Sequence, residues 1–206
     1  MIPAFTYHQN KKELHILDIC FGLGYNTFAT LYYIKKYNLD IQLHIYSPEF
    51  DTQLLHSLEN FEYPPEFDIF KNIINILSKE FYYEDKNIKI EIYNGDARKY
   101  IKKLQNIDVV YQDAFSSDVN HFLWTVEYFS DIKKTLSNDA IVTTYSIATP
   151  IRLSIYQNGF SIYEYKPENS NRITIALNKK EKNDTFKYID MELKKERNQT
   201  AKALYD

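Results

Sequence analysis

The sequence predicts an α/β fold with a mostly parallel, doubly wound sheet that ends in an antiparallel hairpin. Three observations favour it. Apolar strand-like runs alternate with segments of helical periodicity, the first run leads through a glycine-containing turn into a helix, and the last two β-rich runs are separated only by a turn-forming segment. With 206 residues, 44% of them hydrophobic, the chain is long enough to bury the core of one such domain.

Seven short runs rich in β-branched and aromatic residues predict strands over 14–20, 42–47, 89–93, 109–111, 140–145, 161–165 and 172–177. Between them, apolar residues at helical spacing predict helices over 27–36, 52–60, 67–79, 97–104, 126–136 and 150–157. The polar segment 166–171, which contains Pro167, predicts the turn of the final hairpin. We expect a main domain over 1–178 and a basic, partly helical C-terminal tail over 179–206.

The segment around the end of the first strand indicates a ligand. Asp18 lies near the end of the strand, Gly22 and Gly24 form a turn, and Asn26 begins a helix. Glycines let the backbone approach a ligand that a Cβ atom would block, and the helix N-terminus offers N–H donors, so a nucleotide-like cofactor fits; such turns also arise for geometric reasons alone. A dinucleotide fingerprint would need a third glycine where Thr27 stands.

Each of the first four predicted strands has an acidic residue at or just past its end: Asp18, Glu49, Asp96 and Asp113. Ligands of doubly wound sheets bind at the carboxyl ends of the strands. There, a carboxylate after the second strand suits a pair of ribose hydroxyls, and one after the third can receive an adenine amino group. Each acid alone is more simply a solvated loop carboxylate, but their order favours a nucleoside-binding site.

Two longer runs carry a resemblance. The run Asp113-Ala114-Phe115-Ser116-Ser117-Asp118-Val119-Asn120-His121-Phe122-Leu123-Trp124 and the run from Thr144 to Arg152 resemble the methyltransferase domain of the MnmC family of tRNA wobble-uridine modification proteins. That family has Asp-Gly-Phe-x-Pro-x-x-Asn-Pro-x-x-Trp and Thr-Phe-x-x-Ala-x-x-Val-Arg at these places. Its Gly-Phe-Gly-x-Gly-x-Asn motif is similar to residues 20–26, and its Ser-x-Glu to residues 47–49. The resemblance covers residues 14 to about 177.

The resemblance implies a Rossmann-like fold, S-adenosylmethionine as cofactor, tRNA as partner, and methylation of the amine of 5-aminomethyl-2-thiouridine at the wobble position. It assigns Asp113 as the group that orients the amine and accepts its proton. The expected cofactor-binding residues are Asp18, Phe21, Gly22, Gly24, Asn26, Glu49, Asp96 and Ala97. The expected substrate-binding residues are Phe115, Asn120, Trp124 and Arg152. Core packing is an equal alternative for the two aromatic rings.

The chain departs from the family pattern at several positions. Cys20 stands where the family has its first glycine, and Ala114, Ser117 and His121 replace a glycine and two prolines. The sequence has only thirteen residues before the first strand, so we expect the family's upstream segment to be missing and activity to suffer. We expect no flavin-dependent oxidase half like that of the bifunctional family members, so only the methylation step is expected.

Composition narrows the remaining classes. No apolar run approaches the about 20 residues that span a bilayer, no signal peptide opens the chain, and Cys20 is the single cysteine, so we expect a cytoplasmic protein without a membrane partner. No metal-ligand spacing appears among the five histidines and Cys20, and we expect no metal. The net charge of −3 neither demands nor excludes RNA, while basic residues cluster at 98–103 and 179–202.

Alternatives from other classes stay open. One is a small-molecule methyltransferase, or an aminopropyl transferase of the spermidine synthase type, which also uses a sulfonium cofactor and acids at strand ends. Another is a non-catalytic Rossmann-like binding module, for which Cys20 in the glycine turn is the argument. The run from Asp113 to Trp124 favours the tRNA methyltransferase over the other sulfonium-cofactor enzymes, whereas a folded protein that fails to bind S-adenosylmethionine would favour the binding module.

Overall fold

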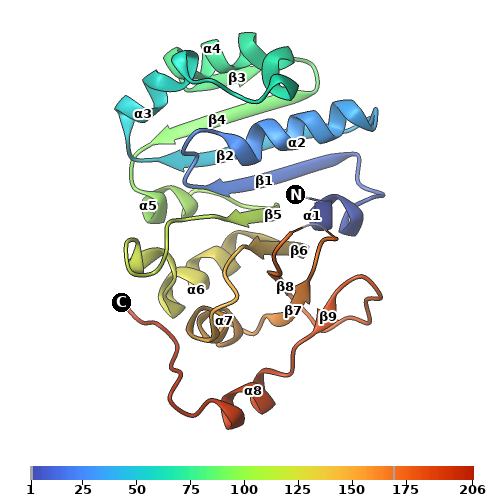
Figure 1. Cartoon of the computed structure of the whole chain (residues 1–206), viewed down its shortest axis with the longest axis vertical. Coiled ribbons are helices and arrows are strands. Elements are labelled where there is room, and N and C mark those ends of the chain that lie inside the picture. The colour runs from blue at the N-terminus through green and yellow to red at the C-terminus, as the bar shows by residue number, and fades with distance from the viewer. Residues whose placement is uncertain (1, 169) are drawn as a thin grey trace. The chain divides into compact units, whose positions relative to one another are not determined.

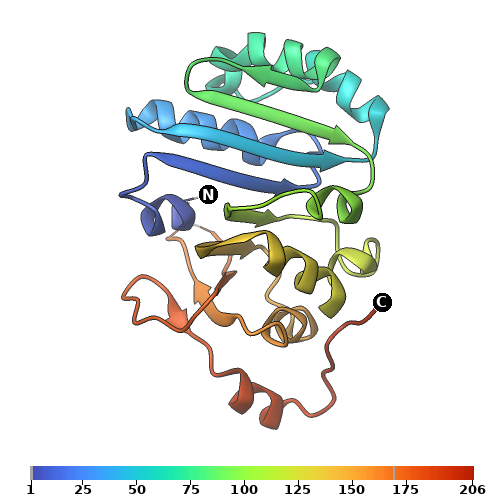
Figure 2. The same cartoon turned by 180° about the vertical axis from the view of Figure 1, so that it is seen from behind.

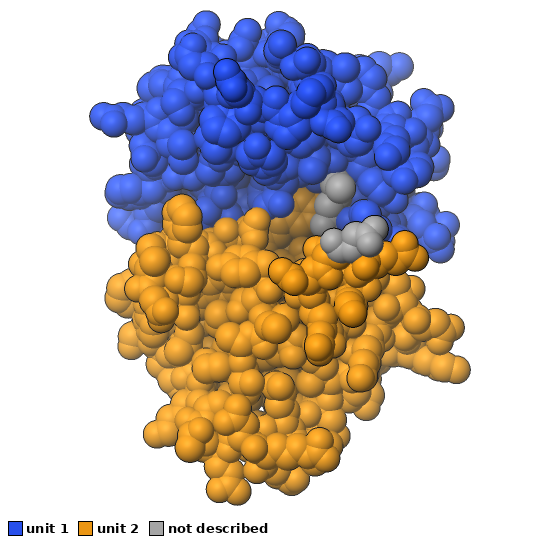
Figure 3. Space-filling model, in the orientation of Figure 1, with its two compact units in different colours: residues 1–100 blue, residues 101–206 orange. Residues whose placement is uncertain are grey.

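The computed structural model of the chain describes residues 2–168 and 170–206. They form two compact units, unit 1 over residues 1–100 and unit 2 over residues 101–206 (Figure 3). Residues 179–206, expected as a tail, fall within unit 2. Among the described residues, no helix is both long enough and apolar enough to cross a bilayer.

Unit 1 is built on a sheet with strand order β3-β4-β2-β1 (Figure 1). Its strands are β1 (Glu13–Ile19), β2 (Gln42–Glu49), β3 (Tyr82–Glu84) and β4 (Ile88–Asn94). β1, β2 and β4 are parallel, and β3 runs antiparallel to β4. The helices are α1 (Ile2–Tyr7), α2 (Tyr25–Lys36), α3 (Thr52–Ser57), η1 (Leu58–Asn60), η2 (Pro65–Phe70), α4 (Lys71–Glu80) and α5 (Ala97–Ile101), the last of which crosses the boundary between the units.

Side chains alternate along the parallel strands of unit 1, as the pleat requires. In β1, Leu14 and Ile16 are fully buried, whereas His15 between them is only half-buried. Helix α2 lies in front of the strands in Figure 1 and behind them in Figure 2, with Phe28 and Leu31 buried. The opposite face therefore carries the polar side chains of the alternation: Glu13, His15, His44, Tyr46, Lys89 and Glu91.

Unit 2 contains a sheet with strand order β5-β6-β8-β7-β9. Its strands are β5 (Ile107–Gln112), β6 (Leu136–Thr144), β7 (Ser161–Tyr165), β8 (Ile173–Leu177) and β9 (Lys187–Tyr188). β5 and β6 are parallel, and the later pairings are antiparallel. The helices are η3 (His121–Leu123), α6 (Val126–Thr135), α7 (Thr149–Tyr156) and α8 (Met191–Arg197).

The predicted fold class and all seven predicted strands are confirmed, and β7 and β8 form the expected hairpin. Three helices differ from expectation. The helix predicted over 52–60 is α-helical only to Ser57 and continues as the 3₁₀ segment η1. The helix predicted over 67–79 begins as the 3₁₀ segment η2 after Pro64 and becomes α-helical at Lys71, and the helix predicted over 97–104 ends at Ile101. Strands β3 and β9 were not predicted, because runs of three and two residues carry too little periodicity to be recognised.

A buried ionic network holds the final hairpin to α7. Arg152 of α7 is 3% exposed; its Nε donates to Oγ1 of Thr174 on β8 at 2.9 Å, and its Nη2 lies 3.4 Å from Oε2 of Glu164 on β7. Burial lowers the pKa of the Arg152 guanidinium, and the Glu164 carboxylate opposes that shift. The expectation that Arg152 binds substrate is therefore corrected, since its side chain is enclosed by the hairpin.

Replacing Arg152 by alanine should lower the free energy of unfolding by about 2–3 kcal/mol, because the Glu164 carboxylate would lose its buried partner. The cost is limited because Glu164 remains partly exposed to water. Urea denaturation of both proteins measures the effect. Arg172→Ala is the matched control, since Arg172 pairs with the same carboxylate from an exposed position and should cost under about 1 kcal/mol. An Arg152→Ala protein as stable as the wild type would contradict the structural role.

Candidate active site

The loop between β1 and α2 has an unusual backbone. Cys20, Gly22 and Gly24 adopt left-handed conformations, with φ values of 65°, 56° and 73°. At Gly24, an added Cβ would lie 2.6 Å from the Phe28 ring and 2.7 Å from the Phe21 ring, so both the backbone and the packing require glycine there. At Gly22 an added Cβ would meet only the Cys20 carbonyl oxygen at 3.8 Å, which leaves open space beside this glycine.

Cys20 occupies the first left-handed position, where the resembling family has glycine. A side chain in this conformation brings Cβ close to the backbone carbonyl and costs about 1–2 kcal/mol. Cys20 therefore adds strain to the loop that glycine would not.

Aromatic side chains support the loop from the interior. Phe21 is 4% exposed and packs edge-on against Phe28, with ring centroids 6.1 Å apart. The Tyr63 hydroxyl donates to the Leu23 carbonyl at 2.9 Å, and burial raises its pKa. The ring of Phe21, expected at the cofactor, thus belongs to the core beneath the loop.

Glu49, at the end of β2, ties the loop to the neighbouring strand. Its Oε2 accepts from the Gly22 N–H at 2.8 Å, and its Oε1 accepts from the N–H groups of Phe50 and Asp51 at 2.7 and 2.9 Å. A carboxylate has about four acceptor positions. Three are filled by backbone, so the carboxylate can receive one ribose hydroxyl directly rather than the expected pair.

Asp18 and Asn26 connect the two ends of the loop. Asp18 is 1% exposed; its Oδ1 accepts from Asn26 Nδ2 at 3.0 Å and its Oδ2 from the Thr27 hydroxyl at 3.1 Å. Both expected cofactor residues therefore bond to each other. The buried carboxylate fixes the start of α2 relative to β1, which shapes the loop that a ligand would meet.

Asp96 and Ala97 follow β4, which pairs with β2 so that Asn94 lies opposite Glu49. This register brings the end of β4 next to Glu49, and the Gly95 N–H donates to the Glu49 carbonyl at 2.9 Å. The exposed Asp96 caps α5 by accepting from the Lys99 N–H at 2.9 Å. The predicted cofactor residues of unit 1 are thus gathered at the carboxyl ends of β1, β2 and β4.

These residues fit S-adenosylmethionine. The open side of Gly22 gives space where a Cβ would otherwise stand, and the Glu49 carboxylate beside it has an acceptor position for a ribose hydroxyl. Asp96 stands on the neighbouring strand end, in the position that suits an adenine amino group.

In unit 2, Asp113 directly follows β5, whose six residues are all buried, and is itself exposed. The preceding Gln112 is fully buried: its Nε2 donates to the Leu123 carbonyl at 2.9 Å, and its Oε1 accepts from the Tyr128 hydroxyl at 2.7 Å. This amide fastens both ends of the loop that follows Asp113. The carboxylate is therefore presented to solvent from a well-supported backbone.

The expected substrate residues of this loop differ in burial. Phe115 is 70% exposed, whereas Trp124 is fully buried and donates from Nε1 to the Phe115 carbonyl at 2.7 Å. Trp124 therefore packs in the core of unit 2, which favours the packing alternative that the sequence left open for this ring. The half-buried Asn120 begins η3, and its carbonyl accepts from the Leu123 N–H.

Further apolar side chains near Asp113 were not predicted from the sequence. Tyr145, 48% exposed, donates its hydroxyl to the Ala114 carbonyl at 2.9 Å, and its ring meets Trp124 edge-on at 5.9 Å. Phe122 in the Asp113 loop is 60% exposed. The signal was present in the Thr144–Arg152 motif, but only the fold brings Tyr145 beside Ala114.

Glycine loop, strand-end acids and sheet topology together define a Rossmann-like S-adenosylmethionine-dependent methyltransferase. The profile of a family described as S-adenosyl-L-methionine-dependent methyltransferases matches residues 67–179, more than half of the chain, and the chain belongs to this family. Within it, the chain is an MnmC-like methyltransferase domain. It is 26% identical to the solved MnmC2 structure of Aquifex aeolicus, with a TM-score of 0.78, over 94% of this chain and 62% of that one.

Curated relatives agree with this placement. An uncharacterised protein of Methanocaldococcus jannaschii is 32% identical over 84% of this chain, and the bifunctional MnmC of Campylobacter hominis is 28% identical over 80% of it. The chain spans about half of the former (47%) and a quarter of the latter (25%). A probable spermidine synthase of Corynebacterium glutamicum shares the fold, with a TM-score of 0.61 at 14% identity.

The strain at Cys20 yields a prediction. The free energy of unfolding of Cys20→Gly should be about 1 kcal/mol higher than that of Cys20→Ala. Only glycine takes the left-handed conformation without steric cost, and this gain exceeds the additional entropy that glycine loses on folding. Chemical denaturation of the two variants and the wild type measures the difference. Alanine serves as the control because it keeps Cβ while removing the thiol. If Cys20→Ala were the more stable protein, the strain would be refuted.

Proposed function

We propose that this chain transfers a methyl group to the primary amine of 5-aminomethyl-2-thiouridine at the wobble position of tRNA. The observation that carries the proposal is the exposed Asp113 carboxylate, held directly after β5 within a run that resembles the MnmC family. The Campylobacter hominis relative, named a tRNA 5-methylaminomethyl-2-thiouridine biosynthesis bifunctional protein, supports this choice of substrate.

The chemistry sets what the residues must do. When bound, S-adenosylmethionine supplies an electrophilic methyl group on its sulfonium. A nucleophilic amine must be neutral and held in line at about 3 Å for transfer. An alkylamine is mostly protonated near neutral pH, so Asp113 is proposed to accept a hydrogen bond from the amine, orient it and receive its proton.

The proposal gives binding roles to the other residues. Glu49 and Asp96 would hold the ribose and adenine of the cofactor, and the backbone at Gly22 would allow close approach. Phe115 would stack on the uracil ring, because its side chain is exposed and its backbone carbonyl is held by the buried Trp124. Asn120 would contribute a polar contact to the same base.

The cofactor assignment predicts the effect of Glu49→Gln. An amide has one acceptor oxygen and no charge, so it cannot satisfy the three backbone donors and a ribose hydroxyl; S-adenosylhomocysteine should bind more weakly by about 1–3 kcal/mol. Titration calorimetry gives the affinity. Glu62→Gln, an exposed acid in the same unit, is the control and should bind as the wild type does. Equal affinities in both variants would remove Glu49 from the site.

The catalytic assignment predicts that Asp113→Asn lowers single-turnover methyl transfer by about 10²-fold, because the amide keeps the shape but cannot take the proton. Asp118→Asn, in the same loop and also exposed, is the control. Melting temperature and cofactor affinity should stay unchanged in both. Normal turnover in Asp113→Asn would exclude the role, and a lowered melting temperature would indicate a structural one.

The substrate is tested with labelled cofactor and tRNA from cells that lack wobble-uridine methylation. Label should enter this tRNA and not tRNA from normal cells, and raised salt should weaken binding because phosphate contacts release counterions. Label transferred to neither tRNA by a protein that binds S-adenosylhomocysteine would overturn the proposal. It would favour a small-molecule methyltransferase or a non-catalytic module.

A further inference from the structure

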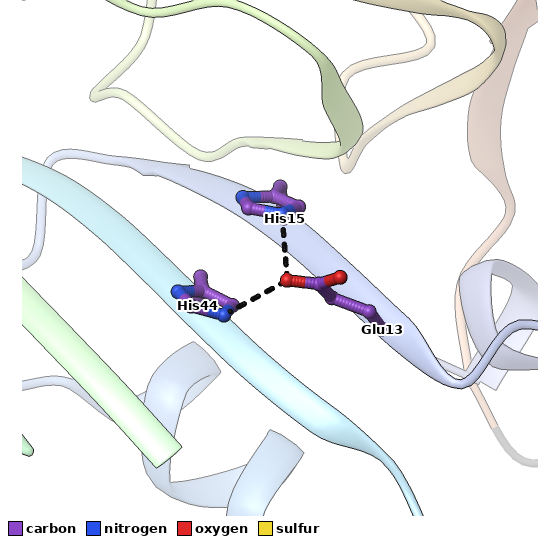
Figure 4. A group of neighbouring side chains, drawn as sticks. All are labelled: Glu13, His15 and His44. Atoms are coloured by element: carbon purple, nitrogen blue, oxygen red, sulfur yellow. Dashed lines mark ion pairs between the residues drawn. The ribbon is translucent and has the colours of Figure 1, made fainter. Parts of the chain in front are cut away.

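A second cluster of chemistry-bearing side chains lies at the amino ends of the strands of unit 1. Glu13 and His15 are two residues apart on β1 and therefore share a face, and the register of the parallel pair sets His15 directly opposite His44 of β2. Figure 4 shows the Glu13 carboxylate pointing between the two imidazoles. Its Oε1 lies 3.3 Å from His15 Nε2 and 3.1 Å from His44 Nε2.

We propose that Glu13, His15 and His44 bind a divalent transition-metal ion of the zinc type. Two imidazoles and one carboxylate form a ligand set that zinc prefers. The potential ligand atoms of these three side chains all lie within 4.8 Å of one another. Ligands at about 2.0–2.2 Å from a tetrahedral ion lie about 3.3–3.5 Å apart. The separations of 3.1 and 3.3 Å are close to that spacing, and the two stacked rings need to tilt towards each other so that both Nε2 lone pairs point at one ion.

The surroundings favour a metal over a shared proton. The imidazole rings are stacked with centroids 4.6 Å apart, an arrangement in which two protonated rings would repel. The Tyr46 hydroxyl lies 3.4 Å from His15 Nδ1, where it can hold the tautomer that directs the Nε2 lone pair towards Glu13.

The site is open enough to be loaded from solvent. The side chains of His15 and His44 are 27% and 26% exposed, and that of Glu13 is 52% exposed. Three protein ligands leave a fourth position for water. Charged neighbours on the same face are Lys89, opposite His44 on β4, Glu84, opposite Lys89 on β3, and Glu91, opposite Tyr46 on β4. Together with Glu13 they give this face a negative balance, which favours a cation.

The position of the cluster separates it from methyl transfer. It lies at the amino ends of β1 and β2, whereas the glycine loop and Glu49 lie at their carboxyl ends. At about 3.3 Å per residue, His15 is about 16 Å from Cys20 along the chain. The ion would therefore act as a clamp between β1 and β2. The sequence did not suggest it, because its ligands belong to two strands and only their register brings them together.

Zinc titration of the full chain after treatment with a chelator tests the site. Calorimetry should give one equivalent of Zn²⁺ bound, and Co²⁺ should give the visible absorption of a four-coordinate ion. His44→Ala and Glu13→Gln should each weaken Zn²⁺ binding by more than about tenfold. Zn²⁺ should raise the melting temperature of the wild type but not of these two variants.

Two controls separate this site from other metal-binding groups. His56→Ala removes an imidazole of the same unit whose Nδ1 lies 2.8 Å from the Ser78 carbonyl oxygen, and Cys20→Ser removes the thiol; both should bind Zn²⁺ as the wild type does. Because Glu13 is exposed, Glu13→Gln should fold normally even if His44→Ala does not. Absence of zinc binding in the wild type, equal affinity in Glu13→Gln, or loss of binding in Cys20→Ser would overturn the proposal.

Discussion

The loop from Cys20 to Gly24 depends on a carboxylate of the next strand, because Glu49 accepts a hydrogen bond from the N–H group at the centre of the loop. Three left-handed residues turn the chain sharply between β1 and α2, and such a turn leaves N–H groups without the partners that a strand or helix would supply. Glu49 accepts one of them, from Gly22, with charge-assisted strength. Glu49 thus has two roles. It holds the loop backbone through the Gly22 N–H group, and it lies beside the open space at Gly22.

Sequence reasoning recovered the strands because their hydrophobic runs are long and their order is simple. It also placed Asp18, Glu49 and Asp96 correctly at strand ends, since a strand end follows from the run itself. Register does not follow in this way, because a slip of β1 against β2 by two residues keeps the same side chains on each face of the sheet. The pairing of His15 with His44 was accordingly beyond prediction, and so was the cluster built on it.

Residue type also failed to predict burial at the candidate site. Asp18 and Asp113 both follow buried strands, yet one is 1% exposed and bonded to Asn26 and Thr27, while the other faces solvent. Trp124 and Phe115 stand in one motif, yet the tryptophan is buried and supports the phenylalanine backbone. A family motif therefore identifies acids and aromatic rings that belong to a site. Only the packing shows whether such a side chain is exposed to a ligand or supports a neighbouring residue that is.

The strained loop and the proposed metal clamp act on the same two strands. Asp18 lies near the end of β1 and Glu49 at the end of β2, and their bonds to Asn26 and Gly22 maintain the left-handed turn. Any loosening of the strand pair would therefore move these acceptors away from their donors. The Cys20 side chain adds strain that a glycine would not, which makes the turn more dependent on that pairing. An ion shared by His15 and His44 would fasten the pair at its other end. Its binding energy would oppose separation of the strands, and thus support the geometry of the loop without contacting it.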